Sequence, residues 1–229
     1  MSDSTSSNSR SIPTPFADYA LNWAPSAVQM PAELYSRLLR RAQVLNATGL
    51  KAYGLLVGDP GDPAFPYRAV DVVVLDPHQN RRNEPSNRAA FQAQGSYFRA
   101  YEDAGFVADP IDLLRAWRRI EGAGLAAVAA FHVHRRQPAN FSSIDYRLHN
   151  PAFAWHLIIS LRDQATPDVR PFLVRKDPDE VGIDEHDDLE GSELSYQGSE
   201  VTPLQLVLTS NREYEVAADL PEYAVAGSA

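Results

Sequence analysis

Two histidines separated by one residue, His132 and His134, are followed after seven residues by Ser142 and after two more by Asp145. On an extended strand, side chains two residues apart project from the same face, so both imidazoles can reach one ion. A carboxylate from the next element would be a third ligand. Three ligands drawn from His and Asp leave a fourth position for water, as in catalytic rather than structural zinc sites. The spacing therefore predicts a metal site with an open position.

Each of these residues also has a purely structural interpretation. A single histidine is more often packed in a core than bound to a metal. Ser142 and Asp145 stand at the spacing of a capping box, in which a serine and an acidic residue satisfy the first backbone groups of a helix. The two interpretations are compatible, because a carboxylate in the first turn of a helix can also turn towards a metal.

The elements around the motif follow from hydrophobic periodicity and from turn residues. A short apolar strand over residues 125–131 leads into His132 and His134. A helix opens at Asp109, with Ile111, Leu114, Trp117 and Ile120 on one face. The other expected elements are a helix over 31–46, a hairpin of strands 51–57 and 68–75, a helix within 86–101, strands 154–161 and 170–175, and a last exposed hairpin of 204–209 and 213–217.

This alternation of helices and strands predicts an α/β (α+β) single domain, with a mixed sheet flanked by helices and a C-terminal β-hairpin extension. We divide the chain into a disordered N-terminal tail (1–15), the domain (16–176), an acidic loop (177–200) and the C-terminal β extension and tail (201–229).

The composition excludes several classes of protein. The net charge of −9 is local, since residues 177–200 hold ten acidic and no basic residues and the rest of the chain has 21 basic against 20 acidic residues. No basic patch interleaved with aromatics predicts nucleic-acid binding, and no apolar run predicts a membrane span. Without cysteine, any metal must be held by histidines and carboxylates. The polar N-terminal tail does not resemble a secretory signal, so we expect a cytoplasmic protein.

Arginines and aromatic residues are concentrated between residues 80 and 101. This composition is typical of binding surfaces, which makes Arg81, Arg82 and Phe91 candidate substrate-binding residues. It is equally common in helices that only pack against a domain, and that alternative stays open.

The motif of His132, His134, Ser142 and Asp145 resembles the signature of the JAMM (MPN+, JAB) zinc metalloproteases. This family includes deubiquitinating isopeptidases and bacterial enzymes that trim ubiquitin-like sulfur-carrier proteins. The helix at 31–46, the strand around Tyr-Gly-Leu-Leu-Val-Gly at 53–58 and the strand at 154–161 resemble the corresponding family elements. The similarity covers about residues 30–176 and is greater to prokaryotic members than to subunits of eukaryotic complexes.

The resemblance implies a JAMM/MPN-like fold and one zinc ion bound by His132, His134 and Asp145. Water would complete the site, and Ser142 would help to hold the oxyanion. Zinc lowers the pKa of bound water to about 7 and polarises a scissile carbonyl. The expected activity is cleavage after the extended C-terminal tail of a ubiquitin-like or sulfur-carrier protein, at a peptide or an isopeptide bond.

The sequence departs from the family at the general base. A glutamate is expected three residues before the glycine of the Gly-Leu-Leu strand, and here that position is Lys51. A cation cannot accept the proton of the water as a carboxylate does. The chain could be an inactive zinc-binding module that still binds a ubiquitin-like protein, it could use Glu84 or Asp76 as a surrogate base, or Lys51 could be an inactivating substitution. An amidohydrolase barrel, which also has two histidines on a strand, would need more chain after His132 than is present.

Overall fold

The computed structural model describes residues 25–176, 196 and 198–210. Within these ranges the chain forms eight strands, five α-helices and two short 3-10 helices. The 3-10 helices lie at Pro77–Gln79 and Arg81–Asn83, between the third strand and the second α-helix. The elements are, in chain order, β1 (Ala27–Pro31), α1 (Ala32–Ala47), β2 (Tyr53–Gly58), β3 (Asp71–Val74), α2 (Pro85–Ala93), α3 (Ser96–Ala100), α4 (Pro110–Gly122), β4 (Ala126–His134), α5 (Ser143–Leu148), β5 (Trp155–Ser160), β6 (Asp168–Val174), β7 (Val201–Pro203) and β8 (Gln205–Thr209).

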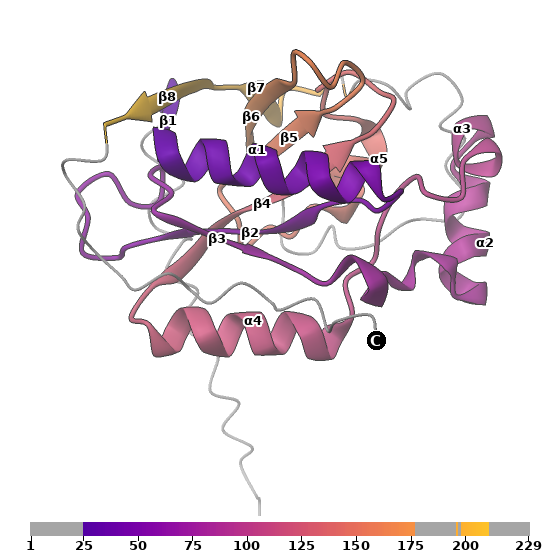
Figure 1. Ribbon diagram of the computed structural model, residues 1–229, viewed down its shortest axis with the longest axis horizontal. Coiled ribbons are helices and arrows are strands. Elements are labelled where there is room, and N and C mark those ends of the chain that lie inside the picture. The colour runs from indigo at the N-terminus through magenta and orange to yellow at the C-terminus, as the bar shows by residue number, and fades with distance from the viewer. Residues whose placement is uncertain (1–24, 177–195, 197, 211–229) are drawn as a thin grey trace, which may run out of the picture.

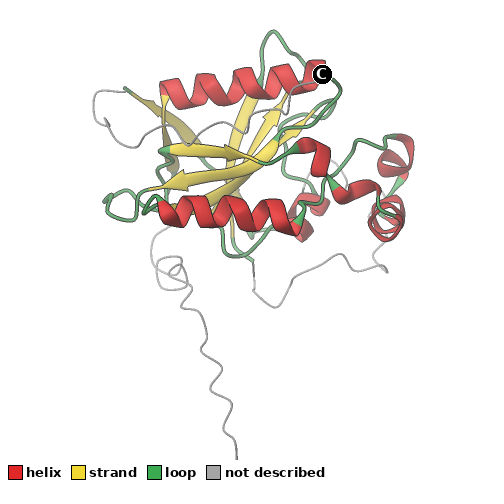
Figure 2. Ribbon diagram, turned by 60° about the horizontal axis from the view of Figure 1, so that its bottom comes forward, coloured by secondary structure: helices red, strands yellow, loops and turns green. Residues whose placement is uncertain are grey.

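A six-stranded mixed sheet of order β3-β2-β4-β5-β6-β7 forms the centre of the domain. Only the central pair, β4 and β5, is parallel; the other neighbours in this sheet are antiparallel. The sheet lies between helices, with α1 over one face and α4 over the other (Figures 1 and 2). The predicted mixed sheet flanked by helices is therefore confirmed, and so is the predicted pairing of β2 with β3.

The two helices cover separate hydrophobic cores. On α1, Leu34, Leu38 and Ala42 are buried against residues of β4 and β5. On α4, Ala116 and Ile120 are buried against residues of β2. Each strand contributes side chains to both hydrophobic cores, because successive side chains of a strand point to opposite faces of the sheet.

Gly54 lets β2 fit between its neighbours. A Cβ atom at this position would lie 2.0 Å from the carbonyl oxygen of Val73 on β3 and 2.9 Å from the ring of Phe131 on β4. A larger residue at position 54 would therefore separate the strands that carry the site.

Three predictions about the elements need correction. Helix α4 has its predicted N-cap at Asp109, but Ile111 and Leu114 are exposed. Asp112 is buried instead, and its carboxylate accepts a hydrogen bond from the Asp76 backbone N–H. The helix expected within 86–101 is two helices, α2 and α3, separated at Gly95 with φ 134°. Lys51 lies outside β2, two residues before its first residue.

The C-terminal extension also differs from the expected arrangement. Strand β7 continues the main sheet, and β8 pairs in parallel with β1, a strand that the sequence did not reveal. The second strand of the expected hairpin (213–217), the tail (1–15) and most of the acidic segment lie outside the described residues. At the end of the acidic segment, the ring of Tyr196 stacks on Tyr146 of the α5 helix, with centroids 4.4 Å apart.

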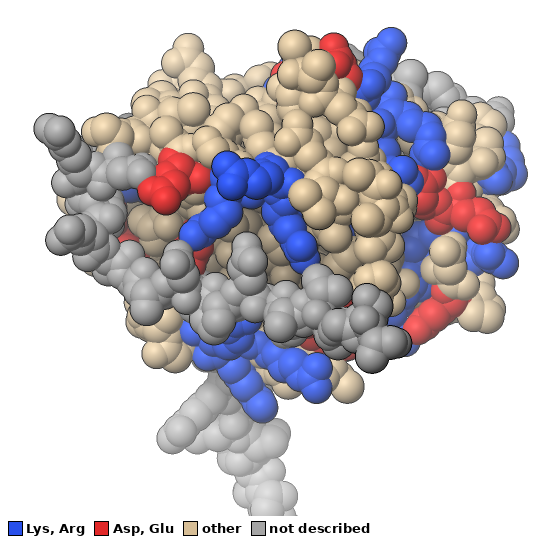
Figure 3. Space-filling model, in the orientation of Figure 1, with Lys and Arg blue, Asp and Glu red and all other residues tan. Residues whose placement is uncertain are grey.

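Within the described ranges, no helix is both long and apolar enough to span a membrane. On the face shown in Figure 3, Lys and Arg side chains stand in separate groups, several of them beside acidic side chains.

Candidate metal centre

Strand β4 and helix α5 bring His132, His134 and Asp145 together. Phe131 and Val133 point into the α1 core, so the alternating His132 and His134 project from the opposite face. Asp145 lies in the first turn of α5. One donor atom from each of the three residues lies within 4.8 Å of the others. This group could hold a metal ion.

A chain of buried histidines determines which nitrogen of His132 carries its proton. The chain ends at the backbone carbonyl of Phe153, 2.9 Å from His149 Nε2. A carbonyl only accepts hydrogen bonds, so His149 Nε2 is the donor. In neutral His149, Nδ1 must then accept from His156 Nδ1 at 3.2 Å. His156 Nε2 in turn accepts from His132 Nδ1 at 2.7 Å, which leaves His132 Nε2 without a proton.

A second carbonyl determines the tautomer of His134 in the same way. His134 Nδ1 lies 2.8 Å from the carbonyl oxygen of Pro138 and donates to it. In neutral His134, Nε2 therefore also carries a lone pair. The two Nε2 atoms are 2.9 Å apart. Two lone pairs at this distance repel each other unless a cation lies between them.

The distances between the donor atoms fit a tetrahedral zinc ion. His132 Nε2 lies 3.0 Å from Asp145 Oδ1, and His134 Nε2 lies 3.6 Å from Asp145 Oδ2. With metal–ligand distances near 2.1 Å, tetrahedral geometry places neighbouring donors about 3.4 Å apart. The observed separations, including that of the two nitrogens, lie on both sides of this value. The donor set, two imidazoles and one carboxylate, is also one that zinc accepts.

Ser142 holds the carboxylate of Asp145 in place. Its backbone N–H and its hydroxyl both donate to Asp145 Oδ2, at 2.9 and 2.6 Å, and its Oγ accepts the Asp145 backbone N–H at 3.2 Å. This reciprocal arrangement is a capping box at the start of α5. The structural interpretation of Ser142 is thus correct. Its single hydroxyl proton is engaged with Asp145, so donation to an oxyanion would require rotation of the hydroxyl.

Burial keeps His132, His149 and His156 neutral. It lowers the pKa of His132 to about 4, although the nearby Asp145 charge acts in the opposite direction. Burial likewise lowers the pKa of His149 to about 4 and that of His156 well below its usual value. For Asp145, burial alone would raise the pKa, but His132 and His134 hold it well below its usual range. Neutral imidazoles and an ionised carboxylate are the states that bind a metal.

Lys51 faces the same space as the two histidines. Tyr53 is paired with His132, and the Val133 backbone N–H donates to the Ala52 carbonyl at 3.0 Å. Continuing this register places Lys51 opposite His134 and on the same side of the sheet. Burial lowers the pKa of the Lys51 ammonium to about 8, partly offset by the charges of Asp145 and Asp103.

A cavity of about 330 Å³ opens in front of these residues. Lys51, Ser142 and the three candidate ligands form one part of its wall. Most of the remaining wall is apolar and aromatic, and comes from β2, α4, α5 and the segment between α3 and α4. Its large apolar side chains are Leu55, Leu75, Phe98, Phe106, Leu113, Trp117, Ile144, Leu148 and Phe153.

The candidate substrate-binding residues do not line this cavity. Phe91 is completely buried and Arg82 is 1% exposed, so neither side chain lies on the surface of this arrangement, and their contact with a substrate stays a prediction. Arg82 donates instead to the backbone carbonyls of Ala104 and Phe98, and Phe91 belongs to the small core of the α2–α3 region. Arg81 forms an ion pair with Glu84 at 2.7 Å.

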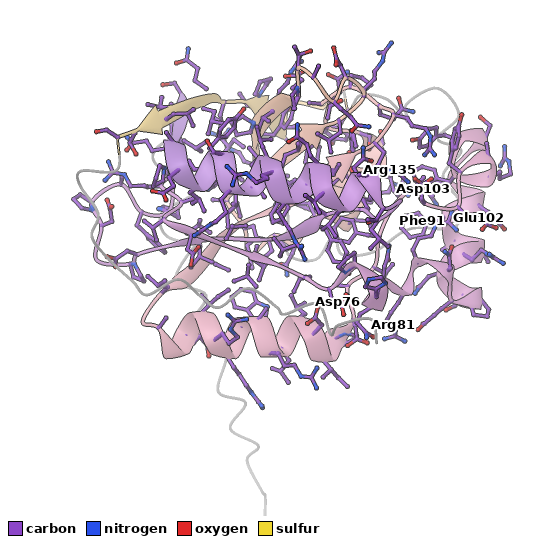
Figure 4. All side chains as sticks on the ribbon, viewed as in Figure 1. Asp76, Arg81, Phe91, Glu102, Asp103 and Arg135 are labelled. Atoms are coloured by element: carbon purple, nitrogen blue, oxygen red, sulfur yellow. The ribbon has the colours of Figure 1, made fainter. Side chains whose placement is uncertain are left out.

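The possible surrogate bases are also placed elsewhere. Glu84 is paired with Arg81, and Asp76 caps the first 3-10 helix through the His78 backbone N–H. Figure 4 shows Asp76 and Arg81 near α4, away from Asp103 and Arg135. Neither Glu84 nor Asp76 lines the cavity. The carboxylates that do line it are Asp145 and Asp103.

His149 and His156 were not identified from the sequence. His156 is a polar residue within the apolar run of β5, and polar residues in fully buried strands need partners. His149 is the C-cap of α5, four residues after Asp145 in the first turn of that helix. Both signals were present, but neither specifies which histidine contacts which.

Comparison with known proteins gives only distant similarities. No protein family model and no curated protein matches the sequence. Solved structures similar to this chain include a protein from Desulfitobacterium hafniense (22% identity, TM-score 0.49, 80% of this chain and 93% of that chain) and one from Salinibacter ruber (17%, 0.47, 86% and 100%). A JAB1/MPN domain protein from Archaeoglobus fulgidus is also similar (12%, 0.36, 80% and 99%). The fold and site thus define a mixed α/β domain with a candidate metal centre beside an apolar cavity.

Proposed function

We propose that this domain is a zinc-dependent hydrolase of the JAMM type, and that its substrate is the extended C-terminal tail of a ubiquitin-like or sulfur-carrier protein. The observation that carries the proposal is the convergence of His132 Nε2, His134 Nε2 and Asp145 at one end of a cavity. Both imidazole tautomers are set by carbonyl groups that do not belong to the site itself.

A zinc ion bound by these ligands would supply Lewis acidity and would lower the pKa of a bound water. The residues of the chain have separate tasks. Ser142 orients the Asp145 carboxylate, while His156 and Pro138 orient His132 and His134. The apolar cavity wall would receive the substrate and exclude water from it. Lys51 stands where a proton acceptor is needed, and only its neutral form can accept a proton.

The state of Lys51 limits the rate that such a site could reach. With a pKa of about 8, roughly a tenth of Lys51 is neutral at pH 7. Lysines with lowered pKa values can act as general bases. A carboxylate at this position would be in the accepting form at neutral pH. We therefore expect slow hydrolysis by the chain as it stands, and faster hydrolysis when an acid replaces Lys51.

Lys51 also favours a second candidate function. A protein that keeps the metal centre but has a cation at the base position could bind the tail of a ubiquitin-like protein without cleaving it. In that case the zinc ion and the cavity would serve recognition.

One experiment separates the two candidates. Zinc content and cleavage of a ubiquitin-like fusion protein ending in diglycine would be measured for the chain and for Lys51→Glu, with Arg118→Glu as a control on an exposed position of α4. Slow cleavage by the chain and faster cleavage by Lys51→Glu would support the hydrolase. Zinc binding without cleavage by either protein would favour the binding module, and absence of zinc from both would contradict both proposals.

A further inference from the structure

The cavity contains a cation that has no hydrogen-bond partner among the described residues. Lys51 makes no side-chain hydrogen bond or ion pair with any residue that the structure describes, although it lines the cavity. The two arginines that also line it are already engaged, since Arg135 and Arg136 both donate to Asp103, at 2.7 and 2.9 Å. Figure 4 shows Arg135 and Asp103 side by side near the α2–α3 region. Among the described residues that line the cavity, Lys51 is thus the cation without an ion pair.

The charge balance of the site favours an anion. A divalent ion held by two neutral imidazoles and one carboxylate keeps an excess of positive charge, and Lys51 increases it. Burial makes this excess costly, because a partly buried ammonium loses hydration without gaining a partner. A ligand that brings one negative charge to a point between the metal and Lys51 would reduce the excess positive charge and would give the Lys51 ammonium a hydrogen-bond partner.

The rest of the cavity restricts what can carry that charge. Its wall also includes large apolar side chains, among them Leu113, Trp117 and Phe153. Most of the wall is apolar, which suits a carboxylate on an apolar chain better than a phosphate group. A volume of about 330 Å³ is at the small end of ligand pockets, and suits a short apolar segment rather than a folded partner.

We propose that the cavity binds the free C-terminal carboxylate of a peptide, held between the metal and Lys51, with the apolar residues before it against the aromatic wall. This inference rests on the metal centre of the proposed function and deepens it. It holds for a hydrolase that retains its product and for a module that only binds. A carboxylate at position 51 would repel the carboxylate of the peptide, whereas the Lys51 ammonium attracts it.

Binding can be measured by calorimetry on the zinc-loaded full chain. The probes are an acetylated tetrapeptide of two leucines and two glycines with a free carboxylate, the same peptide as its C-terminal amide, and 3-phenylpropanoate as a small acid. A charge-assisted hydrogen bond in a partly buried site contributes about 1.5–3 kcal/mol. We therefore expect the acid to bind roughly 10- to 100-fold more tightly than the amide.

Variants assign this difference to Lys51. Lys51→Met should strongly reduce the preference for the acid, down to the part that the metal alone supplies. Lys51→Arg should keep most of the preference, and Arg118→Met, which removes an exposed charge, should leave it unchanged. Equal binding of acid and amide by the zinc-loaded chain would overturn the inference while leaving the metal centre intact. Binding of 3-phenylpropanoate but not of the peptide acid would overturn the assignment to a peptide. A chain that takes up no zinc would instead contradict the proposed function, which zinc analysis reveals before any peptide is added.

Discussion

Replacing His156 tests whether the buried histidine chain positions the metal ligand. His156 Nε2 accepts the Nδ1 proton of His132 at 2.7 Å, and both side chains are buried. In His156→Leu the Nδ1–H of His132 has no acceptor when Nε2 binds a metal. Without metal, His132 can avoid this cost by moving the proton to Nε2. The loss therefore falls mainly on the metal-bound state.

An unsatisfied buried donor costs about 1–3 kcal/mol, and removal of such supporting contacts typically weakens metal binding by about 10- to 100-fold. We expect a loss of this size for zinc in His156→Leu. His156→Gln keeps an acceptor near the same position and should recover most of the affinity. Competition with a chromophoric chelator measures the affinity, and ¹⁵N spectra of the histidine rings report the tautomer of His132. Unchanged affinity in a folded His156→Leu protein would refute the positioning role.

Three further predictions concern stability. Lys51→Met should stabilise the metal-free protein by about 1–3 kcal/mol at pH 7, because the pKa of Lys51 falls from 10.5 to about 8 on folding. The gain in unfolding free energy of Lys51→Met over the unchanged chain is complete below pH 8 and disappears between pH 8 and 10.5. Urea unfolding with chelator present can check this pH dependence, and a gain that does not change with pH would contradict it. Gly54→Ala should destabilise the fold by about 3 kcal/mol or more, since its Cβ overlaps the Val73 carbonyl, and a wild-type melting temperature would contradict this. Arg82→Met should expose the amides of α2 and α3 to faster hydrogen exchange, because two backbone carbonyls lose their donor; unchanged exchange there would show that Arg82 does not hold this region.

The parts of the fold that could be predicted are those where local pattern and burial agree. Strand β4 alternates between core residues and histidines, and α4 opens with an N-cap at Asp109 followed by proline. The same reasoning placed His132, His134 and Asp145 together, because strand periodicity and a helix start are both local features.

The remaining parts depend on contacts that are distant in sequence. Strand β1 has no clear pattern of its own, and is defined by β8, which pairs with it from the other end of the described chain. Arg82 looks like a surface residue from its type, but backbone carbonyls of Phe98 and Ala104 satisfy it within the structure. The sequence could not show these partners. For the same reason the contacts of His156 became visible only when β4 and β5 were placed side by side.

The most direct test of the metal centre is the zinc content of the purified full chain, measured by mass spectrometry after dialysis against buffered zinc. We expect about one zinc ion per chain, a strong loss in His134→Ala, and no change in His78→Ala, which removes an exposed histidine outside the cavity. Zinc retained by His134→Ala at the wild-type level, or lost equally from both variants, would contradict a site built on His132, His134 and Asp145.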